Sequence, residues 1–161
     1  MPYRLKVEGM DELTAMLAKA EDAAPGIAAQ ALYKGAGVVA DEISNGARGL
    51  KTTTFRYAAG GRQREPSPEE KEALVSAGAA GIARFHKTGN SVDTSVGYGR
   101  SGYASVNGKS KPVAVIANAI NSGTSFMKKQ PFIRKAVSAS QGKATAAIEE
   151  EIRTRVEQII K

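Results

Sequence analysis

The chain has 161 residues, of which 42% are hydrophobic and 24% charged, and this balance is typical of an ordinary globular protein. It contains no cysteine, which excludes disulfides and thiolate metal sites. No apolar run approaches the roughly 18 residues that a membrane-spanning helix needs. We therefore expect one soluble domain over residues 1–161, made in a reducing cytoplasm and without a membrane partner.

Positive charge is concentrated in one segment of the chain. The formal net charge is +7, and residues 91–135 carry seven basic side chains against a single acidic one, Asp93. The seven are Arg100, Lys109, Lys111, Lys128, Lys129, Arg134 and Lys135. Such a segment suits a phosphate backbone or an acidic protein surface, and a set of solvated loop lysines is the alternative interpretation.

The N-terminal part predicts a strand and two helices. Apolar residues alternate with charged ones in the period of a half-buried strand, which Gly9 ends, at Tyr3, Leu5 and Val7. A short amphipathic helix follows over residues 11–21. A second helix begins at Pro25, because proline is well tolerated in a first helical turn.

The second helix carries a continuous apolar stripe. Its members recur at helical spacing: Ala28, Leu32, Ala36, Val39, Ile43, Ala47 and Leu50. Gly46 and Gly49 are possible end points. Gly35 and Gly37 lower helix propensity in the middle, and we interpret them as positions that permit the close approach of a neighbouring element.

Residues 52–81 are interpreted as an excursion from the main fold. The stretch 52–67 is rich in glycine, arginine and proline and predicts a loop that is disordered in the free protein and orders on assembly. Ser67 then has the character of an N-cap, with Pro68 first in a short helix to about Ala77. Gly78 and Gly81 follow it.

The next segment predicts strands and a hairpin. Residues 92–98 alternate in period two and indicate a second strand. Asn107-Gly108 is the preferred dipeptide of a tight hairpin turn, so residues 103–106 and 113–117 are predicted hairpin partners. A turn over 121–123 and a loop over 124–130 lead to the last helix.

The last helix begins at Pro131 and is the longest. Its apolar face comprises Ile133, Val137, Ala144, Ile148, Ile152, Val156 and Ile159, and Gly142 is expected to bend or split it. The order of elements predicts an α+β fold, a small antiparallel sheet with helices packed on one face and a long C-terminal helix.

The sequence offers little for catalysis. Its one histidine, His86, has no partner histidine or cysteine for a metal site, and we interpret it as a surface residue. The acidic runs at residues 11–12, 69–70 and 149–151 fall in predicted helices and are interpreted as solvated faces. We expect no enzyme activity, no cofactor and no metal.

Aromatic and basic residues interleave over one stretch, at Tyr98, Arg100, Tyr103, Lys109 and Lys111. This arrangement is found in proteins that bind nucleic acids on strands and loops. A basic nucleic-acid-binding protein is therefore an alternative function, although tyrosines at alternating strand positions are more commonly packing residues.

Residues 117–136 carry the most distinctive pattern of the chain. A turn of Gly123, Thr124 and Ser125 and a short spacer lead to Pro131-Phe132-Ile133-Arg134, which opens the terminal helix. This block resembles the minor tail component family of lambdoid siphophages, proteins of tail completion and head–tail joining. Residues 7–13 and the alanine-rich second helix also resemble that family, so the likeness covers most of the chain.

The resemblance implies a structural virion protein made in the bacterial host cytoplasm and located in the tail or neck. It implies a homo-oligomeric ring, with tail-tube, tail-terminator or connector proteins as partners and passing contact with genomic DNA. The expected interface or DNA-facing residues are Arg100, Lys109, Lys111, Lys128, Lys129 and Arg134.

The family block also has a direct physical interpretation. Gly123 supplies a turn conformation, and Thr124 or Ser125 can bind neighbouring backbone amides. Pro131 begins the helix and Phe132 packs against the sheet. The block is thus a strand-to-helix connection that determines the fold, or else a direct contact with a neighbouring subunit.

Overall fold

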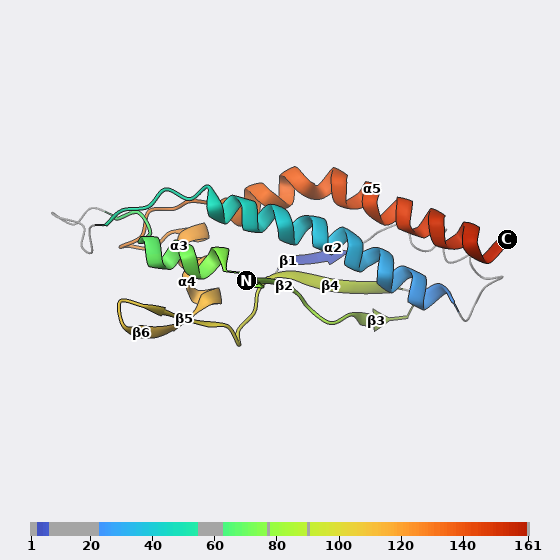
Figure 1. Ribbon diagram of the computed structural model, residues 1–161, viewed down its shortest axis with the longest axis horizontal. Helices are drawn as coiled ribbons and strands as arrows, with labels where there is room; N and C mark the ends of the chain where they lie inside the picture. Colours follow the sequence, from blue (N-terminus) through green and yellow to red (C-terminus); the bar gives the residue numbers. More distant parts are fainter. Residues whose placement is uncertain (1–2, 7–22, 55–62, 77, 90, 161) are drawn as a thin grey trace.

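A computed structural model describes residues 3–6, 23–54, 63–76, 78–89 and 91–160 (Figure 1). The elements are β1 (Tyr3–Lys6), α2 (Ala24–Arg48), α3 (Pro68–Val75), β2 (Ala80–Ile82), β3 (His86–Thr88), β4 (Ser91–Tyr98), β5 (Tyr103–Val106), β6 (Lys109–Pro112), α4 (Val113–Ser122) and α5 (Phe132–Ile160). The predicted α+β class is confirmed. The predicted helix over 11–21 lies outside the described residues.

Strand β4 is the centre of the larger sheet. It pairs antiparallel with β1 on one side, where Leu5 lies opposite Thr94. On its other side it pairs antiparallel first with β3 and then with β2, where Ile82 lies opposite Val96. The Thr94 hydroxyl donates to the Ala83 carbonyl at 2.7 Å, which bridges the gap between β2 and β3.

The helices α2 and α5 form an antiparallel pair on one side of this sheet (Figure 1). The whole predicted stripe of α2 is buried. Of the α5 face, Ile133, Ala144, Ile148 and Ile152 are buried, whereas Ile159 is 47% exposed. The helix continues through Gly142 without a break, so the expected split is wrong.

Gly35 explains how closely the two helices pack. A Cβ atom at this position would lie 2.6 Å from Cδ1 of Ile148 and 3.1 Å from the Ala144 carbonyl oxygen. Only a residue without a side chain therefore leaves room for Ile148. Gly37 faces open space instead, so the expectation of a close approach is confirmed for Gly35 alone.

The hairpin turn is confirmed, but one of its strands is not. Asn107 and Gly108 adopt φ values of 53° and 70°, as a tight two-residue turn requires. The partner of β5 is β6, with Tyr103 opposite Pro112. Residues 113–117, predicted as the second strand, instead begin helix α4.

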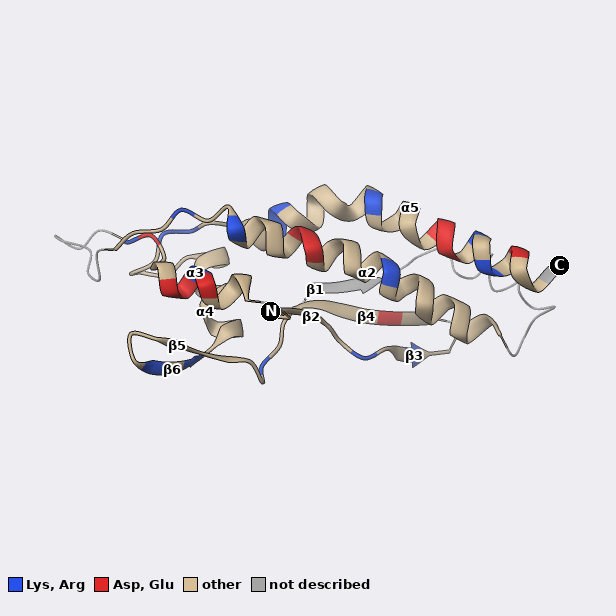
Figure 2. Ribbon diagram, viewed as in Figure 1, with Lys and Arg blue, Asp and Glu red and all other residues tan. Residues whose placement is uncertain are grey.

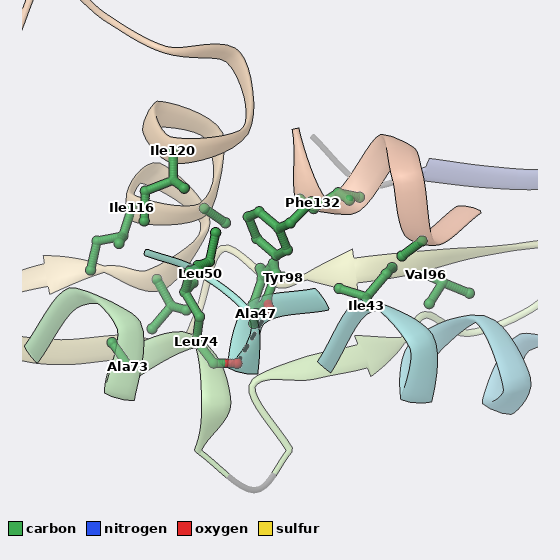
Figure 3. Close-up of a cluster of buried hydrophobic side chains, with 14 of the residues drawn as sticks. Ile43, Ala47, Leu50, Ala73, Leu74, Val96, Tyr98, Ile116, Ile120 and Phe132 are labelled. Carbon is green, nitrogen blue, oxygen red and sulfur yellow. Dashed lines mark hydrogen bonds between the residues drawn. The ribbon is translucent and has the colours of Figure 1, made fainter. Parts of the chain in front are cut away.

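The presumed excursion over residues 52–81 contains parts of the main fold. Ala73 and Leu74 of α3 are buried in the same apolar cluster as Ile43 of α2. Residues 80–82, which we expected to lie beyond the end of the short helix, form a strand of the larger sheet. Figure 3 shows this cluster, in which the Tyr98 hydroxyl donates to the Leu74 carbonyl at 3.2 Å.

Candidate functional site

The family-like block lies in the connection between α4 and α5, residues 121–132, to which we refer as the joint. Gly123 caps α4 by donating its N–H to the Ala119 carbonyl at 2.9 Å. Its dihedrals are φ 77° and ψ 161°, a region that only glycine occupies readily. A Cβ there would also lie 2.9 Å from Cβ of Lys129. The turn role predicted for Gly123 is confirmed.

Thr124 closes the loop that follows. Its hydroxyl oxygen accepts hydrogen bonds from the N–H groups of Phe126 and Met127, at 3.2 and 2.9 Å. Its own N–H donates to the Met127 carbonyl at 3.0 Å. Thr124 therefore ties the turn to neighbouring amides as expected, while Ser125 is exposed on the loop surface.

The joint is paired with the chain segment that precedes α3. Arg64 N–H donates to the Phe126 carbonyl and Lys128 N–H donates to the Arg64 carbonyl, both at 2.8 Å. Gln63 adds a bond from its side-chain amide to the Thr124 carbonyl at 2.6 Å. Residues 63–64 and 126–128 thus lie side by side as two extended segments.

Two amide side chains hold the start of α5. The buried Asn121 accepts from the N–H of Ile133 at 3.1 Å and of Arg134 at 3.5 Å, so it caps the helix from a distance. The side-chain amide of Gln130 binds the backbone of Lys51 twice: it accepts from the Lys51 N–H and donates to the Lys51 carbonyl, at 3.0 Å each. Neither residue was singled out from the sequence, because their partners are remote along the chain.

Pro131 and Phe132 then begin α5. The Lys135 N–H donates to the Pro131 carbonyl, the first backbone bond of the helix. Phe132 is buried and its ring centroid lies 6.2 Å from that of Tyr98 on the central strand β4 (Figure 3). The predicted packing of Phe132 against the sheet is confirmed. The block connects helix α4 to helix α5, so the expected strand-to-helix connection is wrong.

A partly buried ion pair secures the segment beside the joint. Arg64 donates to both carboxylate oxygens of Glu70, at 2.7 and 2.8 Å. Glu70 also completes a capping box, accepting from Ser67 N–H at 2.8 Å, while Ser67 Oγ accepts from Glu70 N–H at 3.1 Å. The N-cap role of Ser67 is confirmed.

Glu70 does not belong to a solvated face, as the sequence indicated, since it is 3% exposed. Burial alone would raise its pKa, but the hydrogen bonds from Arg64 and Ser67 N–H and the positive charges of Arg64 and Lys111 lower the pKa below its ordinary value. The same hydrogen bond raises the pKa of Arg64. The spacing of Ser67 and Glu70 is the sequence signal for their capping box.

The basic segment divides into two groups in space (Figure 2). Lys109 and Lys111 lie on β6, and Arg100 lies in the turn that precedes β5. In the other group, Lys128 and Lys129 lie in the loop before α5, and Arg134 and Lys135 lie in the first turn of α5. The six residues expected to form one interface are therefore divided between two separate regions of the structure.

The aromatic–cationic pattern is only partly accessible. Tyr98 is buried, so its ring cannot stack on a base. The same burial raises the pKa of Tyr98 far above the ordinary value. Tyr103, by contrast, is 65% exposed on the hairpin. His86 is exposed on β3, opposite Asp93 in the strand register.

Within the described ranges, no group of three or more metal-binding side chains occurs. No helix among these residues is both long enough and apolar enough to cross a membrane. Comparison of the chain with protein families, with characterised proteins and with solved structures gives no match.

Proposed function

We propose that the chain is a structural protein of a tailed phage or prophage, which acts in tail completion or head–tail joining as one subunit of a ring. The observation that carries this proposal is the block of Gly123, Thr124, Ser125, Pro131 and Phe132, which resembles the minor tail component family. The proposed protein works through its interfaces and has no cofactor and no turnover. Its location is the tail or neck of the virion.

The geometry of the joint supports this proposal in one respect. The side chains of Thr124, Asn121 and Gln130 bind backbone groups of the protein itself. The loop nevertheless leaves Phe126 77% exposed on a segment whose backbone is paired with Arg64. Phenylalanine is enriched at the cores of protein–protein interfaces, so Phe126 is a candidate contact with another protein.

The proposal is tested in the phage or lysogen that carries the gene. After deletion of the gene, we expect unjoined heads and tails in electron micrographs and a loss of infectious titre, restored by the gene supplied in trans. Mass spectrometry of purified wild-type particles should detect the chain. A normal titre after deletion contradicts the proposal.

The basic residues are tested in the same system. A variant with Lys109, Lys111, Lys128 and Lys129 all changed to Glu is expected to fail in complementation, because reversed charge repels an acidic partner or the DNA. Two double variants, one for each group of lysines, then show which surface is required. Full complementation by the quadruple variant contradicts a role for these residues in assembly.

A nucleic-acid-binding protein is the second candidate, favoured by the exposed Tyr103 on the hairpin that carries Lys109 and Lys111. Its binding to duplex DNA should then weaken steeply between about 50 and 200 mM salt. Fluorescence anisotropy with a labelled duplex measures this dependence. A flat response, or no binding at low salt, removes this candidate.

A further inference from the structure

An open groove of about 470 Å³ lies where the end of α2 meets the start of α5. Its floor is apolar, formed by the buried side chains of Leu50, Phe132 and Ala136. Gly46 and Gly49 also line it and contribute no side chains. The volume of the groove is large enough to receive an apolar side chain.

The rim of the groove is mainly cationic. Lys51, Lys128, Lys129 and Lys135 all line it and are exposed. Of the two carboxylates in the lining, Glu65 is already engaged: it lies 3.2 Å from Nζ of Lys128 and accepts from the Gln130 amide at 2.5 Å. The remaining positive charges surround an apolar floor.

A second open hollow of about 480 Å³ continues the first. The two share Lys129, Pro131, Lys135 and Ala139, and the second adds Arg134 and Ser138. An elongated ligand could therefore occupy both hollows and contact Arg134 as well as Lys135. A peptide segment matches this shape better than a compact small molecule does.

The positive character comes from these side chains and not from the end of α5. The N–H groups of Ile133 and Arg134 already donate to the side chain of Asn121. They are thus not free to bind an anion. Substituting the lysines should therefore abolish the attraction for an anionic ligand.

We propose that this groove binds an acidic segment of a partner protein, with an apolar side chain on the floor and carboxylates at the rim. Charge complementarity selects this occupant over the alternatives. A DNA backbone would leave Leu50 and Phe132 without an apolar contact. A second copy presenting the same face would bring the rim lysines of the two molecules together. The inference goes beyond the proposed function, since it holds for any partner with such a segment.

The test uses the full chain and a fluorescein-labelled peptide of Glu and Leu, with Leu at helical spacing. Anisotropy should show saturable binding. Substituting Lys129→Glu together with Lys135→Glu should weaken binding at least about tenfold, since both carboxylate contacts become repulsive. The matched control, Arg100→Glu with Lys109→Glu, makes the same change in net charge in the turn before β5 and on β6, and should alter affinity by no more than about twofold.

The apolar floor is tested without a change of charge. Ala139→Phe fills the space shared by the two hollows and should weaken the peptide about tenfold. Ala146→Phe, at an exposed position of the same helix, is its control. Circular dichroism and thermal unfolding verify that each variant folds.

Several results would overturn the inference. These are no binding up to millimolar peptide, equal binding of a polyglutamate peptide without Leu, or equal losses in the two charge-reversal variants. Tighter binding of a duplex DNA that displaces the peptide would assign the groove to nucleic acid. Sedimentation showing that wild-type chain self-associates and Ala139→Phe does not would assign it to a second copy. Failure of the peptide to bind would leave the proposed function intact, because that function is tested separately by deletion of the gene.

Discussion

The helix pair and the joint lie in one small domain but are stabilised in different ways. Between α2 and α5 the buried contacts are apolar, with Ile27, Leu32, Ile148 and Ile152 in one cluster. One exposed ion pair, between Lys34 and Glu151 at 3.0 Å, is added to them. At the joint, backbone groups are bound by side chains such as Thr124, Asn121 and Gln130. Apolar burial tolerates modest changes of shape, whereas hydrogen bonds to a fixed backbone specify one geometry. The first arrangement supplies stability and the second positions a surface.

The largest effect is expected in the helix pair. Leu32→Ala should lower the free energy of unfolding by about 3 kcal/mol, because it removes a buried side chain and leaves a cavity. Denaturant unfolding measures this loss. The control, Val115→Ala, changes a side chain that is 61% exposed and should cost less than about 0.5 kcal/mol. Equal losses in the two variants would contradict the assignment of the pair as the apolar core.

The next largest change in the free energy of unfolding is expected at Gly123, and Gly142 should respond in the opposite direction. Gly123→Ala should cost about 2 kcal/mol, because its φ of 77° and the nearby Lys129 both exclude a side chain. Gly142→Ala, in the uninterrupted α5 with open space around it, should instead stabilise by about 0.5–1 kcal/mol. Thermal unfolding shifts of the same sign in both variants would contradict this contrast.

The smallest effect concerns the ion pair beside the joint. Glu70→Gln should cost about 1–2 kcal/mol near neutral pH, because a charged hydrogen-bond acceptor for Arg64 is lost. Glu72→Gln, on the exposed side of the same helix, is the control and should be nearly neutral. Denaturant unfolding of the two variants side by side measures the difference.

The pH dependence of this difference has a definite sign. Because folding lowers the pKa of Glu70 below 4.5, its contribution to stability is present above that value and disappears as the pH falls through the lower, folded pKa. The gap between wild type and Glu70→Gln should therefore close in acid. A gap that stays constant from neutral pH into acid would show that the carboxylate charge is not what stabilises the segment.

The two regions also differ in how well the sequence predicts them. The α2 stripe follows directly from helical periodicity, because each buried residue repeats at the spacing of the helix. Residues 113–117 were assigned to a strand because they form a short apolar run. Yet Val113, Ile116, Ala117 and Ile120 recur at helical spacing, and all four are buried in α4. A longer window would have favoured the helix.

The joint was predictable only where its chemistry is local. Gly123, Thr124 and Pro131 act on neighbours within a few residues, and their roles were foreseen. Gln130 and Lys51 are far apart in the sequence, and no periodic pattern connects them. The groove was not predictable for the same reason, since α2, α5 and two loops each contribute part of its lining. Sequence proximity had instead suggested one basic surface where there are two.

Gly35 has a consequence for the axial register of the long helices. Ile148 occupies the space above it, so α5 cannot slide along α2 by a helical turn, about 5.4 Å, without displacing that side chain. Near the other end, a Cβ at Gly46 would lie 3.3 Å from the Phe132 carbonyl oxygen, so a second glycine fits the start of α5 against α2. Gly35 and Gly46 thus together fix the position of α5 along α2, and with it the position of the groove at the start of α5.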